Sequence, residues 1–417
     1  MIVTGLQVTN LRAIKSAEFR FQQGFNLIVG LNGVGKTSAL DALSVCLSAI
    51  VKRANSLRSR VGTLWVDDIR IGAEVVTVEC DVQIGGQAYR YLIHRPRERS
   101  VPQKAKGGLP REQVHCTPGL AEFIDDPPSP VSGHEPDGRP LGVFFSTNRA
   151  VPSERAPGKG TASGGVTAAF ANAFADRELR LGEFGAWLRV QESIRGERPA
   201  SGRVLAAFQD SVIRFLPGYA NLRLSGDDSP QILIDRDATT LPVQQLSDGE
   251  RGILALVLDL TRRLSQANPN FTDPASEAEA VVLIDEVDLH LHPKWQRQIV
   301  HNLTRAFPRC QFIATTHSPQ VVASVEPNQV HLLSPSEIGR PDRSLGMDSN
   351  WILRHLMEAD DRPEAAMAAV KSVENLIEEG TFEEARVAIS RARQDGLDLP
   401  EWSVLEARMA RLEILAE

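Results

Sequence analysis

A lysine and a threonine follow a glycine-rich turn near the start of the sequence, and their spacing is typical of phosphate binding. Gly30, Gly35, Lys36 and Thr37 fit the pattern G-x-x-x-x-G-K-[ST] between an apolar run and a helical stretch. The glycines allow successive N–H groups to point inward, and the helix adds its positive dipole end. Lys36 would reach the β- and γ-phosphates, and the Thr37 hydroxyl would coordinate Mg²⁺. The predicted nucleotide-binding residues of this cradle (residues 30–38) are Gly30, Asn32, Gly33, Gly35, Lys36, Thr37 and Ser38.

Two carboxylates, Asp285 and Glu286, follow a second apolar stretch. Residues 281–284 are all apolar, which predicts a buried parallel strand, and ligands bind at the carboxyl ends of such strands. Asp285 suits Mg²⁺, usually through water, and Glu286 suits the general base for an attacking water in phosphoryl transfer. The alternative for Asp285 and Glu286 is a strand that ends in solvated acids without a ligand. The alternative for the cradle is an ordinary glycine turn with a surface lysine. The presence of both elements in one chain disfavours both alternatives.

A third element, at residues 246–250, opens a strongly apolar helix. Ser247 offers a hydroxyl and Gly249 an unobstructed N–H at the positive helix end, where a further anion could bind, with Glu250 beside them. The same pattern is also a good helix N-cap. Its position favours anion binding, because it lies between the cradle and the two carboxylates, and a Thr-Thr-His-Ser segment closes the next strand. His317 in that segment, considered alone, would more often be a structural histidine.

The composition indicates a globular protein without a membrane partner. The 417 residues are 42% apolar, enough for one large domain and something smaller. No stretch of eighteen apolar residues and no secretory signal occurs, so we expect a cytoplasmic protein. The net charge is −7, but residues 351–417 carry about 15 acids against 8 bases, so the rest is close to neutral and leaves room for basic patches. We expect no metal or disulfide role for the widely spaced Cys46, Cys80, Cys116 and Cys310.

The apolar patterns predict a mixed sheet that holds these motifs. Alternating residues around the N-terminus and at 76–84 predict antiparallel strands, and Gly85-Gly86 predicts a hairpin turn. Apolar runs predict buried strands at 25–29, 141–145 and 311–315. The predicted parts of the chain are 1–94 with the cradle, a basic Pro/Gly-rich insertion at 95–140, a sheet return and helical insertion at 141–245, 246–334 with the remaining motifs, and an acidic helical tail at 335–417.

Two of these parts are candidates for contacts with partners. The insertion at 95–140 is rich in proline and basic residues, and both a DNA or partner contact and a solvated loop are compatible with it. The tail has three amphipathic stretches, and its turn at 380–385 resembles that of a tetratricopeptide repeat, but a single copy does not support a solenoid. Its apolar faces could dock on the rest of the chain, assemble subunits or hold a basic partner.

The order of the motifs resembles the ATP-binding-cassette (ABC) ATPase head, in the branch that contains SMC, RecF and OLD proteins. The resemblance implies an α/β P-loop ATPase head, a mixed sheet with an antiparallel β region, carrying a helical insertion and a C-terminal helical tail. By the same resemblance, residues 246–250 are the signature that caps the γ-phosphate of ATP bound on a second subunit. Asp288 lies in the D-loop, and His317 is the catalytic switch histidine. ATP and Mg²⁺ are the implied cofactors.

The sequence departs from this family where a glutamine is expected after the strand at 141–145. Ser146-Thr147-Asn148-Arg149 stands there, so Asn148 is the candidate for the magnesium or water contact of the missing glutamine. SMC-like proteins insert a long coiled coil between the cradle and the signature, whereas this insertion is predicted to be globular. OLD nucleases append a nuclease domain, and the residues after Ser334 are too few and too helical for it.

What remains resembles the stand-alone ATPase subunits of bacterial anti-phage systems, the Septu-type PtuA family and its retron-associated relatives. That resemblance implies a homodimer of heads or a higher oligomer, a separately encoded HNH-type nuclease, and DNA bound directly or through that partner. A RecF-like repair ATPase without a nuclease is the alternative, and a neighbouring HNH reading frame or recombination cluster would discriminate between them. A transporter ATPase is disfavoured by the Asn10-Leu11-Arg12 pattern and the helical tail. The trigger, the nucleic-acid substrate and the rate of ATP turnover stay open.

Overall fold

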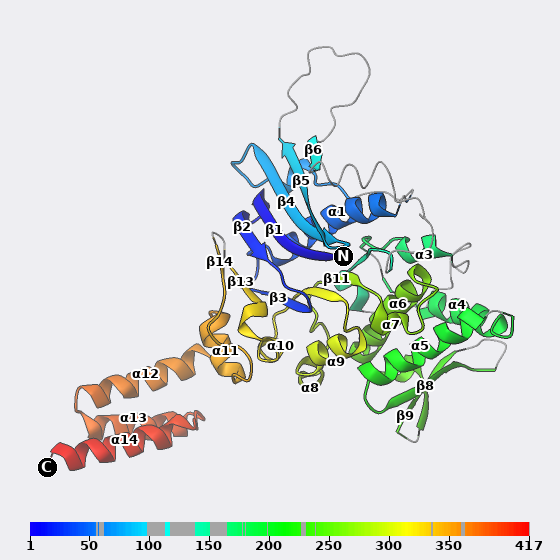
Figure 1. The fold of residues 1–417 in the computed structure, drawn as a ribbon. Helices are drawn as coiled ribbons and strands as arrows, with labels where there is room; N and C mark the ends of the chain where they lie inside the picture. Colours follow the sequence, from blue (N-terminus) through cyan, green and yellow to red (C-terminus); the bar gives the residue numbers. More distant parts are fainter. Residues whose placement is uncertain are drawn as a thin grey trace. The chain divides into compact units, whose positions relative to one another are not determined.

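The computed structural model divides the chain into two compact units, Met1–Ile352 and Leu353–Glu417. Each unit has its own helices and its own buried apolar residues (Figure 1). The structure describes all residues except 56, 58–61, 98–112, 117–137, 151–164, 177, 180, 198, 227–230, 238, 335–336, 360–362 and 417.

The boundary between the units differs from the one that the sequence predicted. The predicted tail begins at residue 335, but β14 (Ile338–Gly339) pairs with β13 (Val330–Leu333) and therefore belongs to the first unit. The two residues of β14 are too short a pattern to be recognised as a strand. Most of the predicted insertion at 95–140 lies outside the described residues.

The first unit is built on a six-stranded sheet with the order β14-β13-β3-β12-β11-β7. Figure 1 labels β14, β13, β3 and β11 of this sheet. The strands from β13 to β7 run parallel, and β14 is antiparallel. Four of the strands are buried along their whole length, as expected of apolar strands covered on both faces. The predicted sheet is thus confirmed, and the carboxyl ends of its parallel strands share one edge. The four buried strands are β3 (Phe25–Val29), β7 (Leu141–Phe145), β11 (Ala280–Ile284) and β12 (Gln311–Thr315).

A five-stranded antiparallel sheet with the order β2-β1-β4-β5-β6 confirms the predicted antiparallel region. Gly85 and Gly86 form the hairpin turn with φ angles of 57° and 83°, which glycine adopts without strain. The Gln311 side chain joins the two sheets, because it bonds the Val3 backbone N–H and C=O at 2.8 and 2.7 Å. The strands are β1 (Ile2–Leu11), β2 (Ile14–Arg20), β4 (Val75–Ile84), β5 (Gln87–Pro96) and β6 (Gln113–Cys116).

Helix α1 (Lys36–Ala54) begins directly after the cradle and packs between the two sheets. It contacts β7, β11 and β12 of the parallel sheet and β1, β4 and β5 of the antiparallel one. Gly35 precedes it with a φ of 109°, a left-handed conformation that favours glycine. A Cβ on Gly35 would lie 2.6 Å from Cγ1 of Ile14, so this glycine also lets β2 approach the cradle.

The remaining elements of the first unit include the predicted helical insertion and a small three-stranded sheet with the order β10-β9-β8. Strand β10 escaped prediction because it has only four residues and ends in proline. The segment that starts at Pro293 forms two short helices, α8 and α9. These elements are α3 (Val166–Phe170), α4 (Leu181–Ser193), α5 (Pro199–Phe215), β8 (Tyr219–Leu224), β9 (Ile232–Arg236), β10 (Thr239–Pro242), α6 (Asp248–Ala267), α7 (Pro274–Glu277), α8 (Pro293–Gln296), α9 (Ile299–Ala306), α10 (Pro319–Val322), and the 3₁₀ turns η1 (Val66–Asp68), η2 (Thr147–Ala150), η3 (Val243–Gln245) and η4 (Pro327–Gln329). Helix α11 (Ser349–Leu356) includes the division between the two units after Ile352.

The second unit consists of the three amphipathic helices that the sequence predicted. They are α12 (Glu364–Glu378), α13 (Phe382–Gln394) and α14 (Glu401–Ala416). The Trp402 ring is fully buried among them, and its Nε1 donates to the Leu397 carbonyl at 2.6 Å. The helices therefore bury their apolar faces on one another. The buried core residues are Val373, Ile377, Ala385, Ile389, Ala392, Trp402, Leu405 and Met409.

None of the helices in the described ranges is long and apolar enough to cross a membrane. The 20-residue helix α6 is largely buried, but charged side chains interrupt its apolar face. Two of them, Asp259 and Arg263, form a buried ion pair at 2.7 Å.

A buried histidine should make the first unit sensitive to acid. The His331 ring packs edge-on against Phe19 and Phe21, and its Nε2 has no hydrogen-bond partner among the described residues. Burial, aided by the charge of Arg340, lowers the pKa of His331 to about 4. The unfolded chain, with an ordinary histidine pKa of about 6.5, is protonated first, so stability is lost as the pH falls from about 6.5 towards 4. The loss from this group should be about 2 kcal/mol at about pH 5.

His331→Phe should remove this part of the acid sensitivity. Phenylalanine keeps an aromatic ring between Phe19 and Phe21 and carries no titrating group. The measurement is urea denaturation of both proteins at about pH 7.5 and pH 5. We expect the variant to lose about 2 kcal/mol less unfolding free energy across this range. Equal losses in the two proteins would show that His331 does not titrate between these values.

Candidate nucleotide site

The glycines of the cradle lie where the backbone turns left-handed or where a side chain would not fit. Gly33 and Gly35 have φ angles of 81° and 109°. A Cβ on Gly30 would lie only 2.4 Å from the Leu333 carbonyl oxygen of β13. Asn32 and Gly33 are exposed at the tip of the loop, and Ser38 is buried in the first turn of α1. The loop therefore has the shape that the motif predicts, with its tip open to solvent.

The Lys36 ammonium folds back into the loop of the cradle. It donates to the Gly30 carbonyl at 2.7 Å and to the next carbonyl, that of Leu31, at 2.8 Å. Burial lowers the pKa of Lys36, while the nearby carboxylates of Asp285 and Glu286 oppose this shift. The positive charge is thus held in the cradle and faces two acids from β11, although these motifs lie about 250 residues apart in the sequence.

Asp285 is the point at which the cradle meets the second motif. The Thr37 hydroxyl donates to the Asp285 carboxylate, with distances of 3.1 and 3.3 Å to its two oxygens. The Thr315 hydroxyl donates to the same carboxylate at 2.6 Å. Asp285 is 3% exposed, so these hydrogen bonds replace the water that a buried charge needs. The structure therefore brings Thr37 and Asp285 together, as their predicted roles require.

Glu286 follows at the carboxyl end of β11 and is half-buried. Its φ angle of 49° is left-handed, which is costly for a residue with a side chain. Its backbone N–H donates to the Thr315 hydroxyl at 2.7 Å, and the next N–H, of Val287, donates to the Thr315 carbonyl at 2.9 Å. Strand β12 thus holds the backbone of Glu286 from one side.

The predicted D-loop and switch residues meet beyond the two strands. The Asp288 carboxylate accepts hydrogen bonds from the Thr316 hydroxyl and from the backbone N–H of His317, the latter at 3.4 Å. His317 is half-buried at the carboxyl end of β12. Asp288 therefore positions the segment that carries His317.

The predicted signature starts α6 with a reciprocal cap. The Glu250 N–H donates to the Ser247 hydroxyl at 3.4 Å, and the Ser247 N–H and hydroxyl donate to the Glu250 carboxylate at 3.0 and 2.7 Å. The Tyr219 hydroxyl also donates to Glu250, at 2.7 Å. Burial opposes the ionisation of Glu250, but the bonds from Tyr219 and Ser247 lower its pKa overall. The cap explains the local role of Glu250, and Ser247 is left exposed at the helix end.

Gly249 packs against the segment that follows Glu286 in the same chain. A Cβ on Gly249 would lie 2.4 Å from the His290 carbonyl oxygen and 3.3 Å from Leu291. His290 itself is left-handed, with a φ of 59°. Among the described residues, the hydrogen bonds of the Ser247 side chain stay within its own cap and do not reach the cradle.

Asn148, the candidate for the missing glutamine, is tied to a different residue. Its amide nitrogen donates to both carboxylate oxygens of Asp176 at 2.9 Å. The Ser146 hydroxyl bonds the same carboxylate. The structure therefore does not bring Asn148 to Thr37 or Asp285, and its contact with magnesium or water stays a prediction.

Two residues at this site were missed in the sequence. Tyr219 lies 31 residues before its partner Glu250, and no local pattern joins them. Arg149 is 6% exposed, and its guanidinium donates to the backbone carbonyls of Asp285 and Glu286. A charged residue directly after the buried strand β7 is the signal that could have drawn attention to Arg149.

The residues at the centre of the site fit a magnesium ion that is bound together with phosphates. A hydroxyl, from Thr37, and a carboxylate, from Asp285, converge there, and Mg²⁺ prefers oxygen ligands. No group of three or more His, Cys, Asp or Glu side chains in the described part of the chain could hold a metal by itself.

Two family profiles match successive parts of the chain. The first, described as "AAA domain", matches residues 6–121, which include the cradle. The second, described as "AAA domain, putative AbiEii toxin, Type IV TA system", matches residues 143–323. That range includes the signature, both carboxylates and His317. The motifs therefore fall within recognised ATPase domains.

Curated proteins share parts of the sequence. Retron Ec83 probable ATPase of Escherichia coli is 38% identical over 175 residues, which are 42% of this chain and 32% of that protein. Septu protein PtuA of Bacillus thuringiensis is 23% identical over 358 residues, or 81% and 77% of the two chains. DNA replication and repair protein RecF of Geobacter metallireducens is 49% identical over 43 residues, which are 10% of this chain and 12% of that protein. The chain therefore carries an ATPase head that is similar to parts of retron, Septu and RecF proteins.

The match to some relatives covers only part of their length. The matched part spans about a third of the length of the retron ATPase of Escherichia coli. Among solved structures, an SMC head bound to the C-winged helix domain of ScpA aligns with a TM-score of 0.49 at 14% identity, covering 82% of this chain and 98% of that one. The "AAA domain" profile covers the cradle, which remains the predicted nucleotide site.

Proposed function

We propose that this chain hydrolyses ATP at a site shared between two copies of the head. The observation that supports the proposal most strongly is the convergence of Thr37, Asp285 and Thr315, because it joins the cradle to the strand end that carries Glu286. Phosphoryl transfer needs positioning and charge stabilisation more than covalent chemistry. Lys36 and the loop N–H groups would hold the phosphates, and the Glu286 carboxylate would accept a proton from the attacking water.

Thr37 and, through water, Asp285 would hold Mg²⁺. When bound, the ion neutralises charge on the phosphate oxygens, which lowers the barrier to attack by water. His317 would contribute to the same site by contacting the γ-phosphate from the end of β12. The hydrogen bonds between Asp288 and the His317 segment support this placement.

Ser247 and Gly249 would cap the γ-phosphate of the second copy. Ser247 is exposed at the N-terminus of the 20-residue helix α6, where the positive dipole end favours an anion. Its cap with Glu250 holds the hydroxyl in place. The missing side chain of Gly249 lets the start of α6 pack against the His290 carbonyl. A site of this kind is complete only when two heads meet, so ATP would hold the heads together.

We further propose that the ATPase belongs to an anti-phage defence complex and regulates or loads a separate HNH-type nuclease that acts on DNA. The similarity to a retron ATPase and to PtuA supports this role. The second unit is a candidate for the attachment of subunits or partner, because it has its own core and leaves apolar side chains exposed. Val387, Val404 and Ile414 are 67%, 68% and 74% exposed.

Deleting residues 353–417 tests this role of the second unit. The cradle lies in the first unit, so the truncated chain should bind ATP with unchanged affinity. We expect it to lose higher oligomers, seen by light scattering, and to lose co-purification with the neighbouring gene product. Trp402→Ala offers a milder control, because it empties the core of the second unit at a cost of about 3–5 kcal/mol. Retention of both the native mass and the neighbour by the truncated chain would exclude a role of this unit in assembly.

A further inference from the structure

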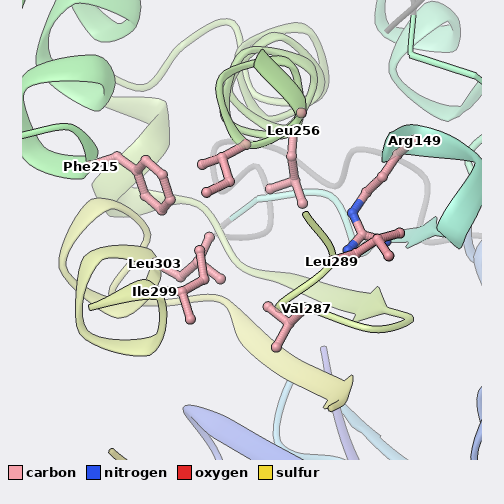
Figure 2. A pocket seen from close by; sticks show the side chains of 9 residues that line it. Arg149, Phe215, Leu256, Val287, Leu289, Ile299 and Leu303 are labelled. Carbon is pink, nitrogen blue, oxygen red and sulfur yellow. The ribbon is translucent and has the colours of Figure 1, made fainter. Parts of the chain in front are cut away.

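Arg149 is a buried cation that no predicted role explains. It lies on the 3₁₀ turn η2, directly after β7, and its side chain reaches toward the segment that follows β11, where Leu289 lies beside it (Figure 2). Nη1 donates to the carbonyls of Ser146 and Asp285 at 2.8 and 2.5 Å, and Nη2 donates to the Glu286 carbonyl at 2.7 Å. The guanidinium thus spans the ends of two parallel strands.

These contacts begin where the ladder between the two strands ends. The last paired residues are Ile284 and Phe145, followed by a hydrogen bond from the Asp285 N–H to the Phe145 carbonyl at 2.9 Å. The Asp285 and Glu286 carbonyls lie beyond this point, and buried carbonyls require partners. The forked guanidinium supplies them in one plane, which a single ammonium group cannot do.

The backbone of Glu286 is therefore held from both sides. Thr315 on β12 accepts the N–H groups of Glu286 and Val287, and Arg149 next to β7 donates to the carbonyls of Asp285 and Glu286. Glu286 needs such support, because its left-handed conformation costs on the order of 1–3 kcal/mol. A backbone held this tightly fixes the direction in which the Glu286 carboxylate leaves the strand.

The Arg149 guanidinium stays charged although it is buried, and it lines a small cavity together with residues of helix α6. Burial lowers the pKa of Arg149 to about 10, so it remains a cation at neutral pH. A cavity of about 20 Å³ separates it from Gly252 and Leu256 on α6 and from Val287 (Figure 2). This is room for about one water molecule.

We propose that Arg149 is a positioning residue for ATP hydrolysis, which clamps the Asp285 and Glu286 carbonyls so that the Glu286 carboxylate faces the attacking water. The inference rests on the proposed function, in which Glu286 is the general base. It assigns Arg149 no contact with ATP. Its loss should therefore reduce kcat and leave nucleotide binding unchanged.

Arg149→Lys tests the proposal, because it keeps the charge and most of the volume but loses the fork. Arg263→Lys is the matched control. Arg263 is equally buried, pairs with Asp259 and donates to the Ala169 carbonyl at 2.6 Å, away from the cradle. Rates are expressed per bound ATP, so that unfolded protein does not count. We expect kcat of Arg149→Lys to fall about tenfold to a hundredfold with KM for ATP within about twofold, and kcat of Arg263→Lys to stay within about twofold.

A double variant separates positioning from a general loss of stability. If Arg149 acts through the Glu286 carboxylate, Arg149→Lys combined with Glu286→Gln should be no slower than Glu286→Gln alone. If the double variant is slower than Glu286→Gln by the same factor that Arg149→Lys alone loses, Arg149 acts independently of Glu286. An unchanged kcat in Arg149→Lys would overturn the proposal outright. If Glu286→Gln itself hydrolyses ATP at the wild-type rate, the proposed function fails. Arg149→Gln, which keeps one planar donor group, serves as the second variant if the lysine protein does not bind ATP.

Discussion

Glu286→Gln should bind ATP as tightly as the wild-type chain and hydrolyse it about a hundred to ten thousand times more slowly. Glutamine keeps the size of the side chain and the backbone contacts with Thr315 and Arg149, so the cradle is undisturbed. It cannot accept a proton from water, which removes the general base. The measurements are ATP affinity by titration and the rate of phosphate release under saturating ATP and Mg²⁺.

The matched control for this substitution is Glu326→Gln. Glu326 is exposed and precedes the short turn η4, away from the residues that contact Asp285. Its rate should equal that of the wild-type chain. If Glu286→Gln hydrolyses ATP as fast as this control, Glu286 is not the general base, whatever the remaining geometry.

Lys36→Ala should weaken ATP binding about a hundredfold, because it removes a charged donor from the loop that surrounds the phosphates. The ammonium already lies in the loop, bonded to the Gly30 and Leu31 carbonyls, so a phosphate would find the charge in place. Hydrolysis should be lost with binding. ATP affinity is measured by fluorescence titration at fixed ionic strength, since the interaction is electrostatic.

Lys15→Ala is the control for the loss of a positive charge. Lys15 is exposed on β2, the strand that packs its Ile14 against Gly35. Lys15 is next to Ile14 in the sequence, and no hydrogen bond joins its side chain to the cradle among the described residues. An unchanged ATP affinity in Lys36→Ala, with Lys15→Ala behaving the same way, would show that the cradle does not bind the phosphates through Lys36.

The sequence allowed prediction of the parts of the site whose chemistry is local. The turn from Gly30 to Thr37 is dictated by consecutive residues, and the apolar run before Asp285 is typical of a buried strand. The meeting of Thr37 and Asp285 then follows from a general property of parallel sheets, because the carboxyl ends of the strands share an edge. The same reasoning correctly predicted the helices of the second unit, where the apolar spacing is helical.

The contacts that escaped prediction depend on side chains from distant segments. Asn148 could be aligned with a missing glutamine, but its partner Asp176 lies 28 residues away, beyond a segment with no readable pattern. Gln311 joins β1 to the parallel sheet across more than 300 residues, and nothing near Gln311 indicates this. Arg149 was visible as a charge after a buried strand, yet its role depends on carbonyls that any sequence would supply. Every residue has a backbone carbonyl, so residue types do not indicate which carbonyls a side chain will bond.

Mixing two inactive variants tests most directly the claim that ATP is hydrolysed at a site shared by two heads. Lys36→Ala lacks a working cradle, and Ser247→Arg lacks a working signature, so each alone should be inactive. In a mixed dimer, the cradle of the Ser247→Arg chain meets the intact signature of the other chain. An equal mixture should therefore recover about a quarter of the wild-type rate, since half of the dimers are mixed and each holds one intact site of two. A Ser247→Arg protein that is fully active alone, or a mixture no faster than its inactive parents, would contradict the account.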